Sequence, residues 1–157
     1  SPPRSNVRTF TGYGSTWDAI QGTFGRDVTF IDSALRYTFE QCAIDPGRIA
    51  LAGIDLHFHG DERPGAIKTE ARANGDLFTH VIAYSPGFTR EQTPNGRPLI
   101  FVSHGTNDGV LPIAATSRTI VPALRARGYT VEYTEFRGGH EVPASITTQA
   151  LDWFLRP

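Results

Sequence analysis

The chain has 157 residues, of which 39% are hydrophobic, enough to bury the core of one domain. Its 15 basic and 16 acidic residues include no long basic run, so it lacks the electrostatic footprint of a nucleic-acid-binding protein. No apolar stretch approaches the roughly 20 residues of a transmembrane helix, and no signal peptide is visible, so we expect a cytoplasmic protein.

The first predicted helix spans residues 27–42. Its apolar residues recur at steps of three and four, and Asp45-Pro46-Gly47 ends the pattern. These apolar residues are Val28, Ile31, Leu35, Phe39 and Cys42. Cys42 is the only cysteine, so an internal disulfide is excluded, and its place on the apolar face predicts a buried structural thiol.

Strands and helices alternate along the rest of the chain. Strands are predicted at residues 48–52, 79–85, 98–104 and 130–136. Helices are predicted at residues 113–127 and 143–155, and Pro122 should shorten or kink the first of these. This alternation is typical of βαβ units, which build a parallel sheet with helices on both faces. We therefore expect a single α/β domain over residues 1–157.

Two candidate catalytic side chains follow the last two predicted strands. Asp108 lies on the loop after the apolar run 99–102, and His140 follows the strand 130–136 behind two glycines that allow a sharp turn. This is the order in which α/β-hydrolases present the acid and the base of their triad. Asp108 could be a simple turn residue, since Asn-Asp-Gly favours turns, but the histidine loop one βα unit later favours catalysis.

These loops, together with further motifs, make the chain resemble the phospholipase/carboxylesterase family of α/β-hydrolases, which are serine esterases. The further motifs are Gly14-Ser15-Thr16-Trp17-Asp18, the helix 27–42, the segment 45–53, Asn74-Gly75-Asp76-Leu77-Phe78 and Ala83-Tyr84-Ser85-Pro86-Gly87-Phe88. The resemblance implies that Asp108 is the triad acid and His140 the triad base. It also implies a small-molecule ester as substrate, no cofactor, and a three-layer sandwich with a mostly parallel sheet. The oligomeric state is left open.

The amino-terminal part of this family contains additional strands and a His-Gly loop that supplies half of the oxyanion hole. Residues 1–25 contain no counterpart of that loop. We therefore expect the amino-terminal strands of the family to be missing from this chain, and only the backbone amide after residue 55 to remain as an oxyanion donor. Losing one such donor typically lowers turnover by about 100-fold to 1000-fold.

The sequence departs from the family at the nucleophile. Where the family has its Gly-x-Ser-x-Gly elbow after a strand, this chain reads Gly53-Ile54-Asp55-Leu56-His57. Asp55 takes the position of the serine, and His57 takes that of the second glycine, which lets a helix pack closely on the strand. Glycines, a proline and charged residues then break the helix expected next. We expect residues 55–71 to be an atypical insert or a disordered segment.

Three interpretations of this segment stay open. Asp55 could be a true nucleophile, as in haloalkane dehalogenases and epoxide hydrolases, where it forms an ester that histidine-activated water cleaves. The chain could instead be a catalytically inactive hydrolase-like binding module. It could also carry an insertion or a frame error in an esterase gene. Ser85 is a weaker candidate for a substitute nucleophile, because it ends the next strand and reads as a structural turn.

A metal-dependent hydrolase is the rival class of enzyme. His57, His59 and Asp61 have the HxHxD spacing of binuclear metallohydrolases, and imidazoles with a carboxylate suit zinc. Such sites need further ligands from other loops. The remaining histidines, His80, His104 and His140, are better assigned to a strand, to the acid loop and to the triad respectively, so we expect no metal.

Overall fold

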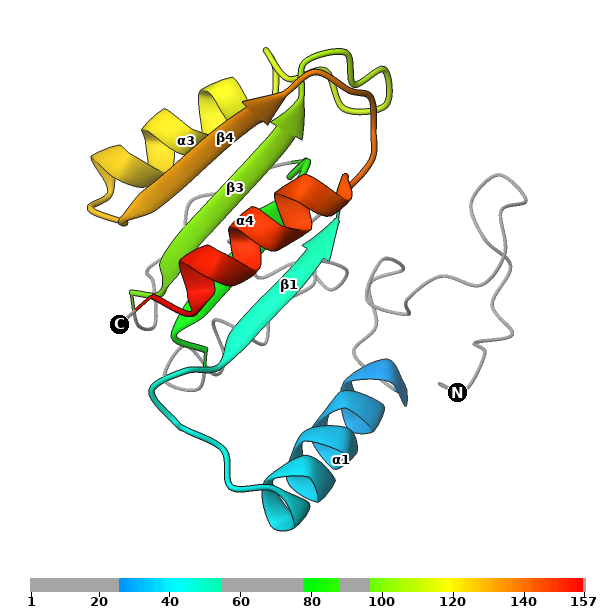
Figure 1. Cartoon of the computed structure of the whole chain (residues 1–157), viewed down its shortest axis with the longest axis vertical. Coiled ribbons are helices and arrows are strands. Elements are labelled where there is room, and N and C mark those ends of the chain that lie inside the picture. Colours follow the sequence, from blue (N-terminus) through cyan, green and yellow to red (C-terminus); the bar gives the residue numbers. More distant parts are fainter. Residues whose placement is uncertain (1–25, 55–77, 88–96, 157) are drawn as a thin grey trace.

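The computed structural model describes residues 26–54, 78–87 and 97–156. In this part of the chain the elements follow the order α1 (Arg26–Gln41), β1 (Ala50–Ile54), β2 (His80–Tyr84), β3 (Leu99–Gly105), α3 (Ser117–Ala126), β4 (Val131–Phe136) and α4 (Ala144–Phe154). The strands form a parallel sheet in the order β1-β2-β3-β4 (Figure 1). No strand precedes β1 within these residues. The predicted α/β class and its parallel sheet are confirmed.

The carboxyl ends of the four strands meet at one edge of the sheet. Ile54 pairs with Tyr84, and Tyr84 in turn pairs with Ser103 of β3, which pairs with Thr134 of β4. Strands β3 and β4 continue for two more residues, as far as Gly105 and Phe136. The loops that follow all four strands therefore begin at the same edge, which is where open parallel sheets bind their ligands.

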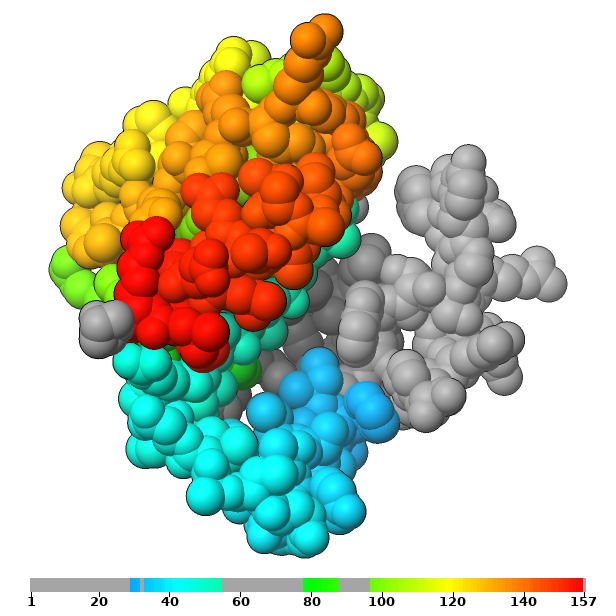
Figure 2. Space-filling view, in the orientation of Figure 1, coloured from blue at the N-terminus to red at the C-terminus, as the bar shows by residue number. Residues whose placement is uncertain are grey.

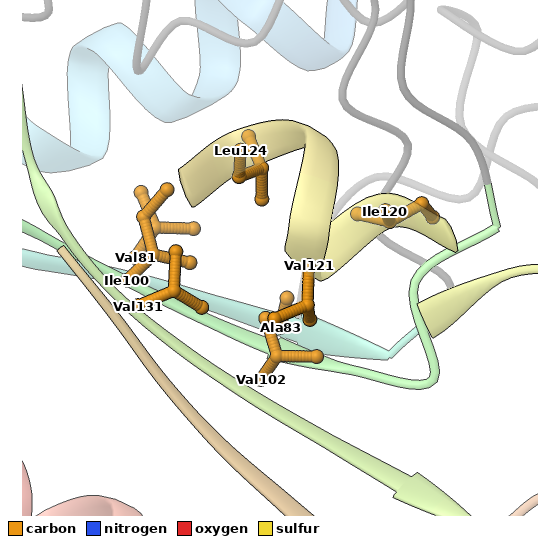
Figure 3. Packing of buried hydrophobic residues seen from close by; sticks show 8 residues of the cluster. All are labelled: Val81, Ala83, Ile100, Val102, Ile120, Val121, Leu124 and Val131. Atoms are coloured by element: carbon orange, nitrogen blue, oxygen red, sulfur yellow. The ribbon is translucent and has the colours of Figure 1, made fainter. Parts of the chain in front are cut away.

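Side chains that alternate along the strands form one core on each face of the sheet. On the first face, strand residues pack against α3 (Figure 3). On the second face, Ile82 and Phe101 pack against α4, which covers this face in Figure 2. The residues of the first core are Val81, Ala83, Ile100, Val102, Val131, Ile120, Val121 and Leu124, and those of the second include Ile146, Ala150 and Trp153. The predicted three-layer sandwich is confirmed.

Helix α1 agrees with the predicted range 27–42 to within one residue at each end. The prediction of a buried thiol is wrong, because Cys42 is exposed. Phe39, from the same predicted apolar stripe, is also 41% exposed. An apolar stripe shows which face of a helix is suited to burial, but burial also requires a layer that covers it. The described elements do not cover this end of α1.

Helix α3 is shorter than the predicted helix 113–127, but Pro122 is not the cause. Residues 113–116 form turns, in which Ala115 donates to the carbonyl of Pro112 and the Thr116 hydroxyl bonds the same carbonyl. Helix α3 begins only at Ser117, and it continues through Pro122, which is exposed. The proline therefore removes one backbone donor without ending the helix.

The first strand begins later than the sequence pattern predicts. It starts at Ala50 instead of residue 48, because the backbone amide of Arg48 donates to the carbonyl of Asp45 in the preceding turn. The predicted insert at residues 55–71 lies outside the described residues. Among the helices that are described, none is long and apolar enough to cross a membrane.

Candidate active site

The backbone beyond β3 holds Asp108 in a fixed orientation. Carboxylate oxygen Oδ1 accepts hydrogen bonds from the backbone amides of Val110 at 2.9 Å and Leu111 at 2.8 Å. The amide of Asp108 itself donates to the carbonyl of Gly105 at 3.2 Å. The side chain of Asp108 is fully buried. The backbone of the loop thus binds Oδ1 and leaves Oδ2 for side-chain partners.

The loop that follows β4 lies directly against the loop that carries Asp108. Thr106 donates its amide to the carbonyl of Phe136 at 2.8 Å, and Asn107 donates to the carbonyl of Gly138 at 2.9 Å. Gly105 makes this approach possible, because a Cβ atom there would overlap the carbonyl oxygens of Gly138 and Gly139. The two loops are held as one unit.

This unit brings His140 to Asp108. Atom Nδ1 of His140 lies 2.8 Å from Oδ2 of Asp108, and 19% of the histidine side chain is exposed. An ionised carboxylate only accepts hydrogen bonds, so Nδ1 carries the hydrogen and Nε2 carries a lone pair in the neutral ring. A histidine in this tautomer can take a proton at Nε2.

Asp108 is ionised at neutral pH. Burial alone would raise its pKa, but hydrogen bonds from Leu111, His140 and Val110 outweigh burial and lower the pKa to about 2. Ser85 makes the smallest contribution in the same direction. The negative charge is therefore present to stabilise a protonated imidazole.

Ser85 directly follows β2 and has a left-handed conformation, with φ of 44°, and its amide donates to the carbonyl of Ser103. Only 1% of Ser85 is exposed. Its hydroxyl lies near the carboxylate of Asp108 without completing a hydrogen bond. This agrees with the interpretation of Ser85 as a structural turn, because a nucleophile needs access to substrate.

A second histidine touches the acid from the buried side. Ring nitrogen Nε2 of His104 lies 3.2 Å from Oδ2 of Asp108 and 2.8 Å from the carbonyl oxygen of Leu111. Ring nitrogen Nδ1 lies 2.7 Å from the hydroxyl of Ser117. The sequence associated His104 only with the acid loop, and its place directly before Gly105 was the one available signal.

The remaining predicted site residues lie outside the described residues. Asp55 comes directly after β1, whose last residue is Ile54. The candidate metal ligands His57, His59 and Asp61 also fall in the range 55–77. Within residues 26–54, 78–87 and 97–156, no group of three histidine, cysteine or acidic side chains could hold a metal ion.

No family model and no curated protein matches the sequence. Several solved structures share its fold. Esterase PE8 matches with a TM-score of 0.54 and 19% identity over 80% of this chain. MGS-M1, an alpha/beta hydrolase enzyme from a Medee basin deep-sea metagenome library, matches with a TM-score of 0.58 and 20% identity over 90% of this chain. A Bacillus cereus carboxylesterase matches with a TM-score of 0.54 and 18% identity over 96%.

These similarities show that the chain has the fold of α/β-hydrolase esterases. The match covers 57% of PE8, 67% of MGS-M1 and 72% of the Bacillus cereus enzyme. The chain thus spans less than two thirds of PE8. The resemblance expected from the sequence motifs is confirmed at the level of the fold.

Proposed function

We propose that this chain is a carboxylic-ester hydrolase in which Asp108 is the acid and His140 the base. One observation carries the proposal: two side chains that are 32 residues apart in sequence meet at 2.8 Å, on adjoining loops at the carboxyl edge of the sheet. The similarity of the fold to esterases supports the same reaction class and a small ester as substrate.

In this proposal His140 accepts a proton at Nε2 from the water that attacks an ester carbonyl, either that of the substrate or that of an ester formed on Asp55. Asp108 holds the ring in the required tautomer and stabilises the imidazolium that forms. His140 then returns the proton to the departing alkoxide, as a general acid. Burial of Asp108 strengthens the interaction between the two charges, because water screens a buried pair less than an exposed one.

Two groups could attack the ester, the carboxylate of Asp55 or a water molecule, and they would break different bonds. A carboxylate that attacks an acyl carbon forms an anhydride, which is more reactive than the ester it replaces. Asp55 is therefore suited to attack a saturated carbon of the alcohol part, which breaks the alkyl C–O bond and leaves an ester on Asp55 for water to hydrolyse. Water activated directly by His140 would instead attack the acyl carbon and break the acyl C–O bond.

The two routes differ in where oxygen from water first appears. A benzyl ester should be hydrolysed in ¹⁸O-labelled water with excess enzyme, so that one turnover occurs. Attack by Asp55 puts the label into the Asp55 carboxylate, whereas direct attack by water puts it into the released acid. A nitrophenyl acyl ester has no saturated carbon in its leaving group, so its hydrolysis reports only the direct route.

The proposal is tested by comparing the steady-state rates of hydrolysis of the benzyl ester and of the nitrophenyl ester with those of His140→Ala. Arg137→Ala is the matched control, because Arg137 is exposed and lies in the same loop. We expect the rate to collapse in His140→Ala and to be unchanged in Arg137→Ala. Equal background rates in both variants and in the wild-type chain, all of them folded, would refute catalysis by the pair.

The second candidate function is a hydrolase-like binding module without turnover. The observation that favours it is the aspartate at position 55, where related elbows carry serine. Such a module would bind a ketone analogue of the ester, in which a CH₂ group replaces the ester oxygen, without hydrolysing the ester itself. Calorimetric titration with that analogue, together with the rate measurements, separates the two functions.

A further inference from the structure

His104 is a fully buried histidine that takes no part in the proposed proton transfer. Its ring nevertheless contacts three groups of the acid loop and of α3. Nδ1 faces the Ser117 hydroxyl at 2.7 Å, and Nε2 faces the Leu111 carbonyl at 2.8 Å. Nε2 also lies 3.2 Å from Oδ2 of Asp108, the oxygen that His140 contacts.

The partners fix where the hydrogen of the ring lies. A carbonyl oxygen can only accept, so Nε2 of His104 carries a hydrogen and donates it to Leu111. The same N–H faces Oδ2 of Asp108 as a second, longer contact. In the neutral ring Nδ1 then accepts, and the Ser117 hydroxyl, which can donate, supplies the hydrogen. The direction of donation runs from α3 through His104 to the acid loop.

Each oxygen of Asp108 therefore lies against two nitrogen atoms. Oδ1 faces the backbone amides of Val110 and Leu111, and Oδ2 faces the rings of His140 and His104. Leu111 is bound at both ends, because its amide donates to Asp108 and its carbonyl accepts from His104. Rotation of the carboxylate would break contacts on both sides.

We propose that His104, oriented by Ser117, is a positioning residue that keeps Oδ2 of Asp108 directed at His140. The step from positioning to catalysis rests on the proposed function, whereas the effect of His104 on the Asp108–His140 contact does not. A histidine that merely fills the core would stabilise the fold and leave that contact unchanged when its own partners are altered.

The first test uses the unaltered chain and needs no turnover. The nitrogen chemical shifts of the His104 ring, measured by NMR at pH 7, report which nitrogen carries hydrogen. We expect hydrogen on Nε2 and none on Nδ1. A ring with hydrogen on Nδ1, whether neutral or charged, would reverse the contact with Ser117 and overturn the assignment.

The second test removes the hydroxyl that orients the ring. In Ser117→Ala, we expect the Nδ1 resonances of His140 to move away from their wild-type positions, because the change reaches His140 through His104 and Asp108. The conservative variant Ser117→Thr keeps a hydroxyl and should restore them. Arg118→Ala is the control, because Arg118 neighbours Ser117 but directs its side chain to Glu135. Unchanged His140 resonances in a folded Ser117→Ala protein would overturn the positioning role.

Rates separate this inference from the proposed function. If the chain hydrolyses esters, Ser117→Ala should lower kcat by as much as roughly 100-fold, the order expected when a catalytic group is misplaced by about 1 Å, with KM little changed. If the wild-type chain shows no turnover but Ser117→Ala still shifts the His140 resonances, the proposed function fails and the positioning role stands.

Discussion

Asn107 donates its backbone amide to the carbonyl of Gly138 at 2.9 Å, and this bond joins the loop of the candidate acid to the loop of the candidate base. Each loop begins at its own strand, so the sheet places their first residues. The bond between the loops then sets the distance between the side chains of Asp108 and His140. The contact between the two side chains therefore depends on the backbone contact between the loops that follow β3 and β4.

Gly105→Ala should separate the two loops. The added methyl group would overlap the carbonyl oxygens of Gly138 and Gly139, which are backbone atoms and cannot rotate away. We expect a loss of about 1–3 kcal/mol in the free energy of unfolding, together with loss of His140-dependent hydrolysis. Urea denaturation and ester hydrolysis measure the two effects.

Gly109→Ala is the matched control for that substitution. Gly109 lies in the same loop, and a Cβ atom there would meet nothing within 4 Å. Its stability should stay within about 0.5 kcal/mol of the wild-type value. If both alanine variants behave alike, the close approach at Gly105 is not what holds the loops together.

Asp108→Asn should abolish a specific dependence of stability on pH. The pKa of Asp108 is lowered from its usual 3.8 to about 2, so the folded state favours the ionised carboxyl. This contribution is complete above the pKa of the unfolded chain and is lost as the pH falls from about 4 to about 2. It is worth roughly 2 kcal/mol at neutral pH.

Thermal unfolding at pH values between 5 and 2 measures this contribution. The wild-type chain should lose more stability across that range than Asp108→Asn does. Glu132→Gln is a control that changes a partly exposed carboxylate on β4, which is paired with Arg156. Identical pH profiles for wild type and Asp108→Asn would contradict the lowered pKa. If the pair is catalytic, Asp108→Asn should also reduce kcat by about 10⁴-fold, through loss of the correct tautomer.

Phe101→Ala should destabilise the sheet on the face covered by α4. Phe101 is fully buried, and its ring lies 5.6 Å from that of Trp153. Removing it leaves a cavity, and we expect a loss of about 3–5 kcal/mol in the free energy of unfolding. Leu99→Ala, in the same strand but at a position that is 41% exposed, should lose much less. Chemical denaturation of both variants measures the difference.

Removal of metal should leave ester hydrolysis unchanged. The proposed proton transfer uses only Asp108 and His140, and the alternative ligands His57, His59 and Asp61 play no part in it. Dialysis against a chelator, followed by rate measurement and elemental analysis, tests this directly. Activity that falls with chelation and returns with zinc would favour the metal-dependent alternative, and His59→Ala should then be inactive too.

The sequence predicted the sheet and the Asp108–His140 contact for related physical reasons. Alternation in a strand and three- or four-residue steps in a helix are local patterns, and parallel strands bring the loops at their carboxyl ends together. The exposure of Cys42 could not be predicted from such local patterns. The apolar residues of α1 show which face of the helix is suited to burial, but not whether another element covers that face. The role of His104 was missed because it depends on Ser117, 13 residues further along the chain.

Restoring a hydroxyl at position 55 tests whether that residue stands where a nucleophile should. Asp55→Ser alone keeps His57 at the position where related elbows need glycine for close packing of the helix. We therefore expect little labelling by a fluorophosphonate probe from Asp55→Ser, and clear labelling from the double variant Asp55→Ser, His57→Gly. Labelling should disappear when His140→Ala is added, because the hydroxyl then lacks its base. A folded double variant that stays unlabelled would show that residue 55 does not reach His140, and the reaction would then have to proceed by direct attack of water or not at all.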